Sequence, residues 1–540
     1  MNAARDTASL LWHGARVLAG SGLAGQARPA ALPRMARALR EAGTSPATLV
    51  AVAAAHRPET TAVIDDRGSL DYAGIDEAGA RLATGMAGHF GESRIRSVGV
   101  MCRNHRGFVI ATLAAGRLGA GLLYLNTDFS APQLAQVCER MRADVIVADE
   151  EFLPRLEGLG VGVIVAWQDS ADNDLPSVDE LVASNPRYRP ARRVSSRPIT
   201  LLTSGTTGAP KGAPRKPNPL ATLGPVATLL QRSRLRAGDP VLIGPPLFHG
   251  FGIALWALAA FLRSPVVLRR RFDPETVLAD TQAHRVACIA AVPAMLQRIL
   301  GLDEATMARY DSTSLHTVLS GAAPLPPALA TRFMDAFGEV LYNGYGSSEV
   351  GIATIATPAE LRAAPGTVGT PSIGTPVRVL DAEGRPVPQG GSGTIFVGGP
   401  LVFSGYAGGG GKEMVDGLMT TGDVGYFDAA GRLHVQGRTD DMIISGGENV
   451  YPQEVEDVLT RHSAIVDAAV IGVDDEEFGQ RLVAYVVPHR QWPGAAELAA
   501  YVKDNLARYK VPREFVEVDE LPRNPTGKVL RTRLRDSGSG

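Results

Sequence analysis

Residues 199–212 read ITLLTSGTTGAPKG, an apolar run that is followed at once by a loop of glycine and hydroxyl side chains. The short, partly β-branched apolar run predicts a strand. Glycines in the loop permit positive φ angles, so successive N–H groups can turn inward around phosphate oxygens. Four hydroxyl groups and the Lys211 ammonium supply further donors. The stretch therefore predicts a strand that leads into a cradle for a polyphosphate.

This loop differs from a Walker A loop. Gly205 lies at the right distance before Lys211, but Pro210 stands where that motif requires a second glycine. Gly212 stands where the motif requires Ser or Thr. An ordinary Ser/Thr/Gly turn without a ligand is the alternative, and the length of the run disfavours it.

Apolar runs alternate with helical patterns on both sides of the loop, between residues 96 and 346. The strand candidates include VGVMC, GLLYL, VIVAD and VGVIVA before the loop, and PVLIGPP, CIAAVP, TVLSGAA and VLYNGYG after it. This alternation predicts an α/β fold of parallel sheets covered by helices. Loops at the carboxyl ends of such strands are available for chemistry.

The later part of the chain changes its pattern twice. Residues 366–437 hold shorter alternating strands broken by Gly and Pro, which predict an antiparallel or barrel-like subdomain. From residue 438 onward the pattern predicts a small α/β unit with helices over residues 452–462 and 495–508. Since 540 residues are too many for one compact core, we expect a large N-terminal and a small C-terminal domain.

Composition excludes several classes of protein. A charged content of 20% and a formal net charge of -2 give no bias toward polyanions, so we expect no nucleic-acid partner. The three cysteines, Cys102, Cys138 and Cys288, have no CxxC spacing and predict buried, reduced thiols in a cytoplasmic protein. The longest apolar stretch, residues 252–262, is shorter than the roughly 20 residues that span a bilayer.

The N-terminal extension, residues 1–49, is rich in alanine, leucine and arginine. Its arginines are Arg5, Arg16, Arg28, Arg34, Arg37 and Arg40. Two interpretations remain open, a basic segment in weak contact with a membrane surface and a helical extension packed on the domain.

Seven motifs occur in one order along the chain. The TSGTTGAPKG run resembles the phosphate-binding signature of the adenylate-forming superfamily, which includes acyl-CoA synthetases, luciferases and peptide-synthetase adenylation domains. The further matches are SGAAP at 320–324, YNGYGSSE at 342–349, TGD at 421–423, GRTDD at 437–441, GGE at 446–448 with Pro452 and Glu454, and PTGK at 525–528. The resemblance covers residues 50–535 and is closest to the acyl-CoA synthetase and fatty-acid CoA ligase branch. It implies an adenylation domain over 50–437, a hinge at 438–441 and a mobile C-terminal domain over 442–540.

The resemblance implies a nucleotide site. Its ATP- and AMP-binding residues are Thr203, Ser204, Gly205, Thr206, Thr207, Gly208, Lys211, Gly321, Ala322, Ala323, Asn343, Gly344, Tyr345, Gly346, Ser348, Asp423 and Arg438. Ser348 stands where many family members have threonine, and its hydroxyl keeps the α-phosphate contact. Asp423 can accept from both ribose hydroxyls, and Arg438 adds a fixed donor. Glu349 is the expected ligand of Mg²⁺, a hard cation that prefers oxygen ligands.

The same resemblance implies the catalytic groups and the second step. Lys528 is expected to bring its ammonium to the oxygen that joins the acyl group to the α-phosphate, where a cation lowers the barrier. The other catalytic candidates are Glu349, Ser348 and His249. Asp440 is the expected hinge residue, and Gly446, Gly447 and Glu448 are expected to line the path of coenzyme A.

The acyl pocket is expected to follow the PLFHGFG run at residues 246–252. Its candidate residues are His249, Phe251, Trp256 and Pro293. No carboxylate occurs between Pro245 and Leu262, which disfavours an amino acid as substrate. Aliphatic and aryl acids both suit an apolar wall.

We therefore expect an AMP-forming acid:CoA ligase that uses ATP, Mg²⁺ and coenzyme A. The N-terminal extension resembles that of bacterial fatty-acid CoA ligases, which implies a medium- or long-chain fatty acid as substrate. The alternatives are an aryl acid, implied by the resemblance of the DDMIISGGENV run to aryl-CoA ligases, and loading of a carrier-protein phosphopantetheine. The sequence does not decide between a monomer and a homodimer.

Overall fold

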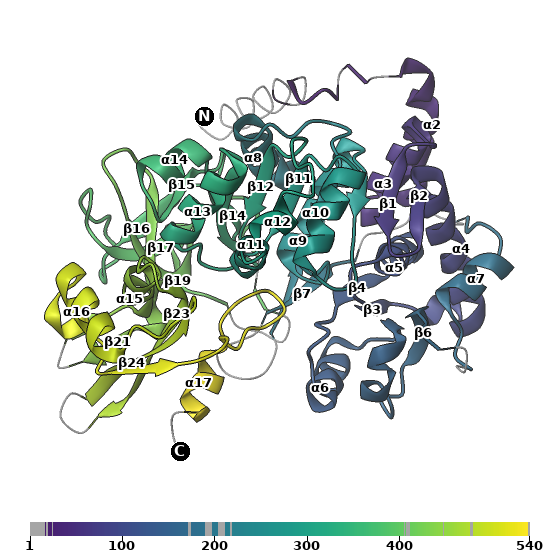
Figure 1. Cartoon of the computed structure of the whole chain (residues 1–540). Helices are drawn as coiled ribbons and strands as arrows, with labels where there is room; N and C mark the ends of the chain where they lie inside the picture. Colours follow the sequence, from purple (N-terminus) through teal and green to yellow (C-terminus); the bar gives the residue numbers. More distant parts are fainter. Residues whose placement is uncertain are drawn as a thin grey trace. The chain divides into compact units, whose positions relative to one another are not determined.

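The computed structural model describes the whole chain except residues 1–16, 18–19, 24, 27, 171–173, 190–196, 204–210, 216–218, 404, 407–410, 446–447, 476–478 and 538–540. It forms two compact units (Figure 1). The first unit comprises Met1–Ala291, Leu302–Val318 and Phe403–Gly411, and the second comprises Val292–Gly301, Leu319–Val402 and Lys412–Gly540.

The first unit contains a six-stranded sheet with helices alongside it. Its strand order is β6 (Gly162–Trp167), β5 (Val145–Asp149), β3 (Ser97–Met101), β4 (Gly121–Tyr124), β7 (Ile199–Thr203) and β8 (Lys211–Arg215). All neighbours pair in parallel except β7 and β8, which pair antiparallel. Every residue of β5 is buried, as expected of a central parallel strand that is covered on both faces. The helices of this region are α4 (Tyr72–Phe90), η2 (Glu92–Arg94), α5 (Arg106–Leu118), α6 (Ala131–Met141), η3 (Glu150–Arg155) and α7 (Val178–Ser184).

A second run of mostly parallel strands lies in the same unit. Its order is β11 (Cys288–Ala291), β9 (Val241–Ile243), β10 (Val266–Val267), β1 (Thr61–Asp65) and β2 (Gly68–Asp71), with only the β1–β2 pair antiparallel. The helices here are η1 (Pro29–Ala31), α2 (Leu32–Ala42), α3 (Pro46–His56), α8 (Pro219–Arg232), α9 (Gly250–Leu262), α10 (Pro274–Ala283) and α12 (Glu304–Met307). The α/β prediction is confirmed by these two sheets. Among the described residues, no helix is both long enough and apolar enough to cross a membrane.

The second unit contains an antiparallel sheet. Its order is β13 (Leu341–Ser347), β14 (Gly351–Ala356), β15 (Thr367–Pro371), β20 (Leu433–Arg438), β19 (Leu418–Phe427), β17 (Gly393–Val397) and β16 (Val377–Leu380), and β18 (Met414–Val415) pairs with β19. The accompanying helices are α11 (Pro293–Leu300), α13 (Pro327–Phe337) and α14 (Pro358–Ala363). Strand β12 (Thr317–Ser320) spans the division between the units. The antiparallel character predicted for residues 366–437 is therefore confirmed.

The C-terminal part of the second unit is a small α/β layer. Its strands are β22 (Glu448–Val450), β21 (Ile443–Ser445), β24 (Gly479–Pro488), β23 (Ile465–Asp475) and β25 (Glu514–Glu517), and its helices are η4 (Thr439–Asp441), α15 (Pro452–Leu459), α16 (Ala495–Asn505), η5 (Arg508–Lys510) and α17 (Arg531–Ser537). One face of the sheet packs its buried residues against α15 and α16, and the other face packs against Leu534 of α17. Burial of apolar side chains on both faces holds this layer together. The three cysteines lie outside it and are buried free thiols.

Candidate active site

Asp423, Tyr345 and Arg438 meet in one cluster in the second unit. Asp423 and Arg438 are register partners on β19 and β20. Tyr345 Oη donates to Asp423 Oδ2 at 2.5 Å, and Arg438 Nη1 donates to Asp423 Oδ1 at 3.3 Å. Each carboxylate oxygen retains further acceptor capacity, so the cluster can still receive hydroxyl donors from a ligand.

Burial governs the electrostatics of this cluster. Desolvation raises the pKa of the Asp423 carboxyl, while the Tyr345 hydrogen bond and the charges of Arg438, Lys412 and Lys528 oppose that rise. Desolvation and then the negative charge of Asp423 raise the pKa of Tyr345. The tyrosine therefore stays a neutral donor to the carboxylate.

The local backbone explains why glycines surround these residues. Gly346 follows Tyr345 at an irregularity in the pairing of β13 with β14, and a Cβ there would lie 1.9 Å from the Gly351 carbonyl oxygen. Thr421 Oγ1 accepts from the Asp423 N–H at 3.1 Å and donates to the Ile395 carbonyl at 3.0 Å. The main chain is therefore fixed on both sides of the cluster.

Lys528 belongs to the same electrostatic neighbourhood. Desolvation and repulsion from Arg438 lower the pKa of the Lys528 ammonium, while Asp441 and Asp423 act in the opposite direction. The residue as a whole remains exposed, so a ligand can reach its side chain. The charges of Arg438, Asp441 and Asp423 all act on the Lys528 ammonium, so Lys528 belongs to the candidate site.

Glu349 follows the end of β13 and is only 7% exposed. The Ser347 hydroxyl accepts from the N–H groups of Glu349 and Val350 at 3.2 and 3.4 Å, which fixes the turn. Ser348, which lies between Ser347 and Glu349 in the chain, is half-buried. A buried carboxylate next to a hydroxyl fits Mg²⁺, which is commonly held by one or two carboxylates together with phosphate oxygens and water.

The predicted adenine loop contains a strained residue. Ala322 has φ of 67°, a left-handed conformation that non-glycine residues rarely adopt. The preceding Ser320 has a buried hydroxyl without a hydrogen-bond partner among the described residues. A Cβ on Gly344 would lie 3.6 Å from the Ser320 carbonyl oxygen, so Gly344 lies beside this loop, and Asn343 is 5% exposed. Strain of this kind gathers at ligand sites.

Two predicted loops fall partly outside the described residues. The phosphate loop connects β7 to β8, whose ends pair at Thr203 and Lys211. Ser204, Gly205, Thr206, Thr207 and Gly208 lie outside the described residues, as do Gly446 and Gly447. Glu448 begins β22 and is exposed.

His249 caps the helix of the predicted acyl pocket. Its Nδ1 accepts from the Phe251 N–H at 3.4 Å at the start of α9. Desolvation lowers the pKa of His249 to about 4, so the imidazole is neutral at neutral pH. Trp256, on the same helix, is 3% exposed, and Pro293 is buried at the start of α11 in the other unit.

Sequence reasoning missed the residue that holds the loop before His249. Asn104 Oδ1 accepts from the Leu247 N–H at 2.8 Å, and its Nδ2 donates to the Pro245 carbonyl at 2.9 Å. The side chain is 5% exposed. Asn104 is 141 residues from Pro245 and 143 residues from Leu247 in the chain, so no sequence signal pointed to these contacts.

Lys412 was missed as well. Its ammonium donates to the Thr421 carbonyl at 2.7 Å, and its charge counters the raised pKa of Asp423. It follows the glycine run at 408–411, of which only Gly411 is described and is exposed. The expected hinge residue, Asp440, is exposed in η4 and accepts from Arg438 Nη2 at 3.2 Å.

The possible metal-ligating atoms of Cys102, His105 and Asp149, all buried, lie within 4.8 Å of one another. His105 Nε2 lies 2.8 Å from Asp149 Oδ1, and His105 Nδ1 accepts from the Gly107 N–H at 3.0 Å at the start of α5. The Arg103 N–H donates to Asp149 Oδ2 at 2.9 Å. These bonds already engage both ring nitrogens and both carboxylate oxygens, and His105 caps α5 while Asp149 holds its ring.

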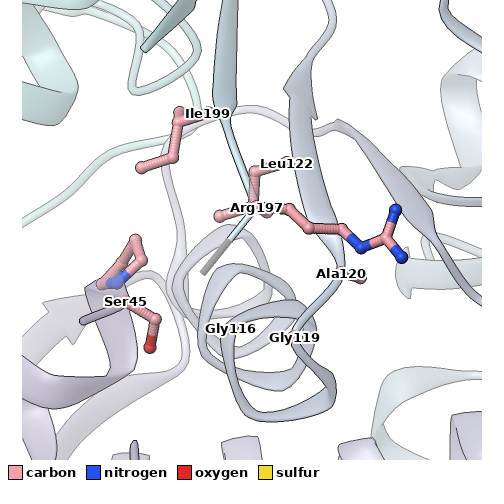
Figure 2. Close-up of a pocket in the computed structure, with 8 residues that line it drawn as sticks. Ser45, Gly116, Gly119, Ala120, Leu122, Arg197 and Ile199 are labelled. Atoms are coloured by element: carbon pink, nitrogen blue, oxygen red, sulfur yellow. The ribbon is translucent and has the colours of Figure 1, made fainter. Parts of the chain in front are cut away.

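A small cavity lies elsewhere in the first unit (Figure 2). Its lining comprises Ser45, Pro46, Gly116, Gly119, Ala120, Leu122, Arg197 and Ile199. Figure 2 shows the Arg197 guanidinium extending to the side opposite Ser45. None of the predicted site residues is among the described residues that line this cavity.

Comparisons with known proteins agree with the motifs. The family model described as AMP-binding enzyme matches residues 50–407, and the model for the AMP-binding enzyme C-terminal domain matches residues 454–528. A feruloyl-CoA synthase from Amycolatopsis sp is 34% identical over 88% of this chain and 96% of its own length. A fatty acid–[acyl-carrier-protein] ligase from Streptomyces coeruleorubidus is 29% identical over 89% of this chain and 94% of its own.

A solved structure extends the likeness to three dimensions. The o-succinylbenzoate CoA synthetase from Bacillus subtilis, in complex with its acyl-adenylate intermediate, has a TM-score of 0.77 and 29% identity, and the match covers 90% of this chain and 98% of that one. The chain therefore belongs to the AMP-binding enzymes of the adenylate-forming superfamily, in the branch of the AMP-forming CoA ligases.

Proposed function

We propose that this enzyme activates a hydrophobic carboxylic acid in two steps at the Asp423 cluster. In the first step a carboxylate oxygen of the acid attacks the α-phosphorus of ATP, and pyrophosphate leaves. In the second step the thiol of coenzyme A attacks the acyl carbonyl, and AMP leaves. The observation that carries the proposal is the convergence of Tyr345, Arg438 and the Lys528 charge on Asp423.

Each group in the cluster has a role in the first step. Asp423 accepts from the ribose hydroxyls, and Arg438 fixes the carboxylate. The Lys528 ammonium stabilises negative charge on the oxygen between the acyl group and the α-phosphate. Mg²⁺, held by Glu349, would neutralise charge on the phosphate oxygens. Neutral His249 orients the acid at the start of α9.

A change of conformation about residues 438–441 separates the two steps. After adenylation Lys528 has no further task, and the thiol needs a path to the acyl carbon. Asp440 is exposed and its carboxylate is tied only to Arg438 among the contacts of the described residues. The small C-terminal domain over residues 442–540 rotates about this hinge and brings residues 446–448 to the thiol path.

An aryl acid is the substrate that the relatives support first. The feruloyl-CoA and o-succinylbenzoate enzymes both act, by their names, on aryl acids. The sequence has no carboxylate between Pro245 and Leu262, which supports an acyl pocket without a negative charge. A fatty acid is the second candidate, supported by the Streptomyces coeruleorubidus relative, whose acceptor is a carrier protein.

A panel of acids tests the proposal. Hydroxycinnamates, benzoates and fatty acids of increasing length are incubated with ATP and Mg²⁺, and pyrophosphate release is measured. Coenzyme A or a phosphopantetheinylated carrier protein is then added, and thioesters are identified by mass spectrometry. We expect an aryl-CoA product. Pyrophosphate release without a CoA thioester would contradict the proposed acceptor, and no release with any acid would contradict adenylation.

We also propose that α2 contacts an anionic membrane surface. Leu32 and Leu39 of this helix are 61% and 51% exposed, and the exposed arginines beside them are Arg34, Arg37 and Arg40. Exposed leucines next to arginines suit the boundary of an anionic bilayer. Flotation with anionic vesicles tests this. Binding lost in a Leu32→Asp, Leu39→Asp variant supports the proposal, and equal flotation of both proteins contradicts it.

A further inference from the structure

The loop that carries Lys528 is organised by one carboxamide. Asn524 Oδ1 accepts from the Thr526 N–H at 3.0 Å, from the Thr526 hydroxyl at 2.7 Å and from the Lys528 N–H at 2.9 Å. The Asn524 N–H donates to the Lys528 carbonyl at 2.9 Å, and the Gly527 N–H donates to the Asn524 carbonyl at 2.8 Å. These bonds fix a closed turn that ends at Lys528.

Arg523 ties this turn to the sheet. Its Nη1 donates to the Gly527 carbonyl at 2.6 Å, and its Nη2 donates to Asp467 Oδ2 at 2.6 Å. Asp467 lies on β23, which pairs with β24 along most of its length. Burial raises the pKa of the Asp467 carboxyl, and the Arg523 charge opposes that rise. A half-buried ion pair of this kind is short and directional, so it fixes the turn at a defined place relative to β23.

The segment around α11 contacts both the strand that carries Asp467 and the turn that carries Lys528. Gln297 Nε2 donates to the carbonyl of Val466, the residue before Asp467, at 2.7 Å. Gly527 has φ of 79°, and a Cβ there would lie 2.8 Å from Val292 Cγ2. All of these residues belong to the second compact unit. The α11 residues lie within the match to the AMP-binding enzyme model, and Asp467 and Gly527 lie within the match to its C-terminal domain.

We propose that Gln297, Asp467, Arg523 and Asn524 form an anchor that positions Lys528 for adenylation alone. The proposal rests on the proposed function, in which Lys528 acts in the first step and withdraws before the second. The Gln297–Val466 bond joins two segments that the hinge would separate. The anchor therefore holds only in the adenylating arrangement, and its loss leaves the thiol step untouched.

Gln297→Met is the central variant, because it keeps the shape of a partly exposed side chain and removes only the donor. Gln389→Met is the matched control, since the exposed Gln389 amide also donates to a backbone carbonyl, that of Asp428, at 3.3 Å. Arg523→Lys keeps the positive charge but cannot donate to the Gly527 carbonyl and the Asp467 carboxylate with the fixed geometry of a guanidinium. Asn524→Ala removes the acceptor of the turn.

Each half-reaction is measured separately. We expect Gln297→Met and Asn524→Ala to lower kcat for acid-dependent pyrophosphate release by roughly ten- to hundred-fold, the effect of misplacing a reacting group by about 1 Å. The KM for ATP should stay within about two-fold, since the ribose contacts are intact. Thioester formation from supplied acyl-adenylate should match the unsubstituted enzyme, and Arg523→Lys should be intermediate.

A double-mutant cycle separates positioning from structural damage. If the anchor acts through Lys528, then Gln297→Met should cause no further loss of adenylation in a Lys528→Ala background. An additional loss there, or an equal fall in both half-reactions, would overturn the anchor. Pyrophosphate release by Gln297→Met at the rate of the Gln389→Met control would also overturn the anchor. If the unsubstituted enzyme released no pyrophosphate with any acid, the proposed function itself would fail, which is a different result.

Discussion

Asp423 is the residue on which the proposed nucleotide chemistry depends. It is held by the Tyr345 hydroxyl, the Arg438 guanidinium and its own backbone bond to Thr421. The sequence predicted Asp423, Tyr345 and Arg438 as residues of one nucleotide site because three separate motifs carry them, but it did not predict that they bond to one another. It could not predict Lys412 or Asn104, because their contacts depend on chain segments that only the fold brings together.

Asp423→Asn should weaken nucleotide binding. The substitution keeps the shape but removes the charge that strengthens the ribose hydrogen bonds, which are worth about 1.5–3 kcal/mol when one partner is ionised. We expect the KM for ATP to rise by roughly ten- to hundred-fold in a pyrophosphate-release assay. An unchanged KM for ATP would show that the ribose lies elsewhere.

Asp441→Asn should change the pH dependence of adenylation. The Asp441 charge raises the pKa of Lys528, against desolvation and Arg438, which lower it. Lys528 acts as a cation, so adenylation is lost as the pH rises through its pKa. Removing Asp441 lowers that pKa further, and the alkaline limb of the kcat profile should move to lower pH. A shift to higher pH would contradict the assigned charges.

At the level of elements, the paired strands β13 and β14 shape the site by close backbone approach. The VLYNGYG run predicted β13, whereas no strand was predicted over β14. The helix prediction for residues 452–462 agrees with α15 apart from its end. The helix predicted to residue 508 ends at Asn505, and η5 follows at Arg508–Lys510. Helix ends depend on local caps and tertiary packing, which apolar periodicity does not encode.

Gly346→Ala should destabilise the protein and abolish adenylation. The new methyl group would lie 1.9 Å from the Gly351 carbonyl oxygen, so the strands must separate. We expect a loss of about 1–3 kcal/mol in the free energy of unfolding, as for overpacked sites. Gly88→Ala in α4 is the control, because nothing lies within 4 Å of its Cβ and alanine favours a helix by about 0.5–1 kcal/mol. Equal thermal stability of the two variants would contradict the close approach.

The whole molecule must serve two chemical steps with one nucleotide site. The order of motifs along the chain predicted the family, and the alternation of apolar runs with helical patterns predicted the α/β class. The anchor around Lys528 could not be predicted, because Asp467 and Gln297 have no motif of their own and act through hydrogen bonds to backbone or to Arg523.

Asp440→Pro should separate the two steps. Proline fixes φ near −65° and restricts the preceding residue, so backbone rotation at the hinge is blocked. We expect adenylation to remain within about three-fold, while thioester formation falls by roughly a hundred-fold, as for a blocked conformational step. Equal losses in both half-reactions would refute the hinge.

The central claim is that Lys528 serves the first step only. Lys528→Ala should reduce acid-dependent pyrophosphate release by at least about a hundred-fold, the typical effect of losing a charge that stabilises the transition state. The same variant should convert supplied acyl-adenylate and coenzyme A to thioester at close to the unsubstituted rate. Undiminished pyrophosphate release, or parallel loss of both half-reactions in a folded protein, would contradict the account.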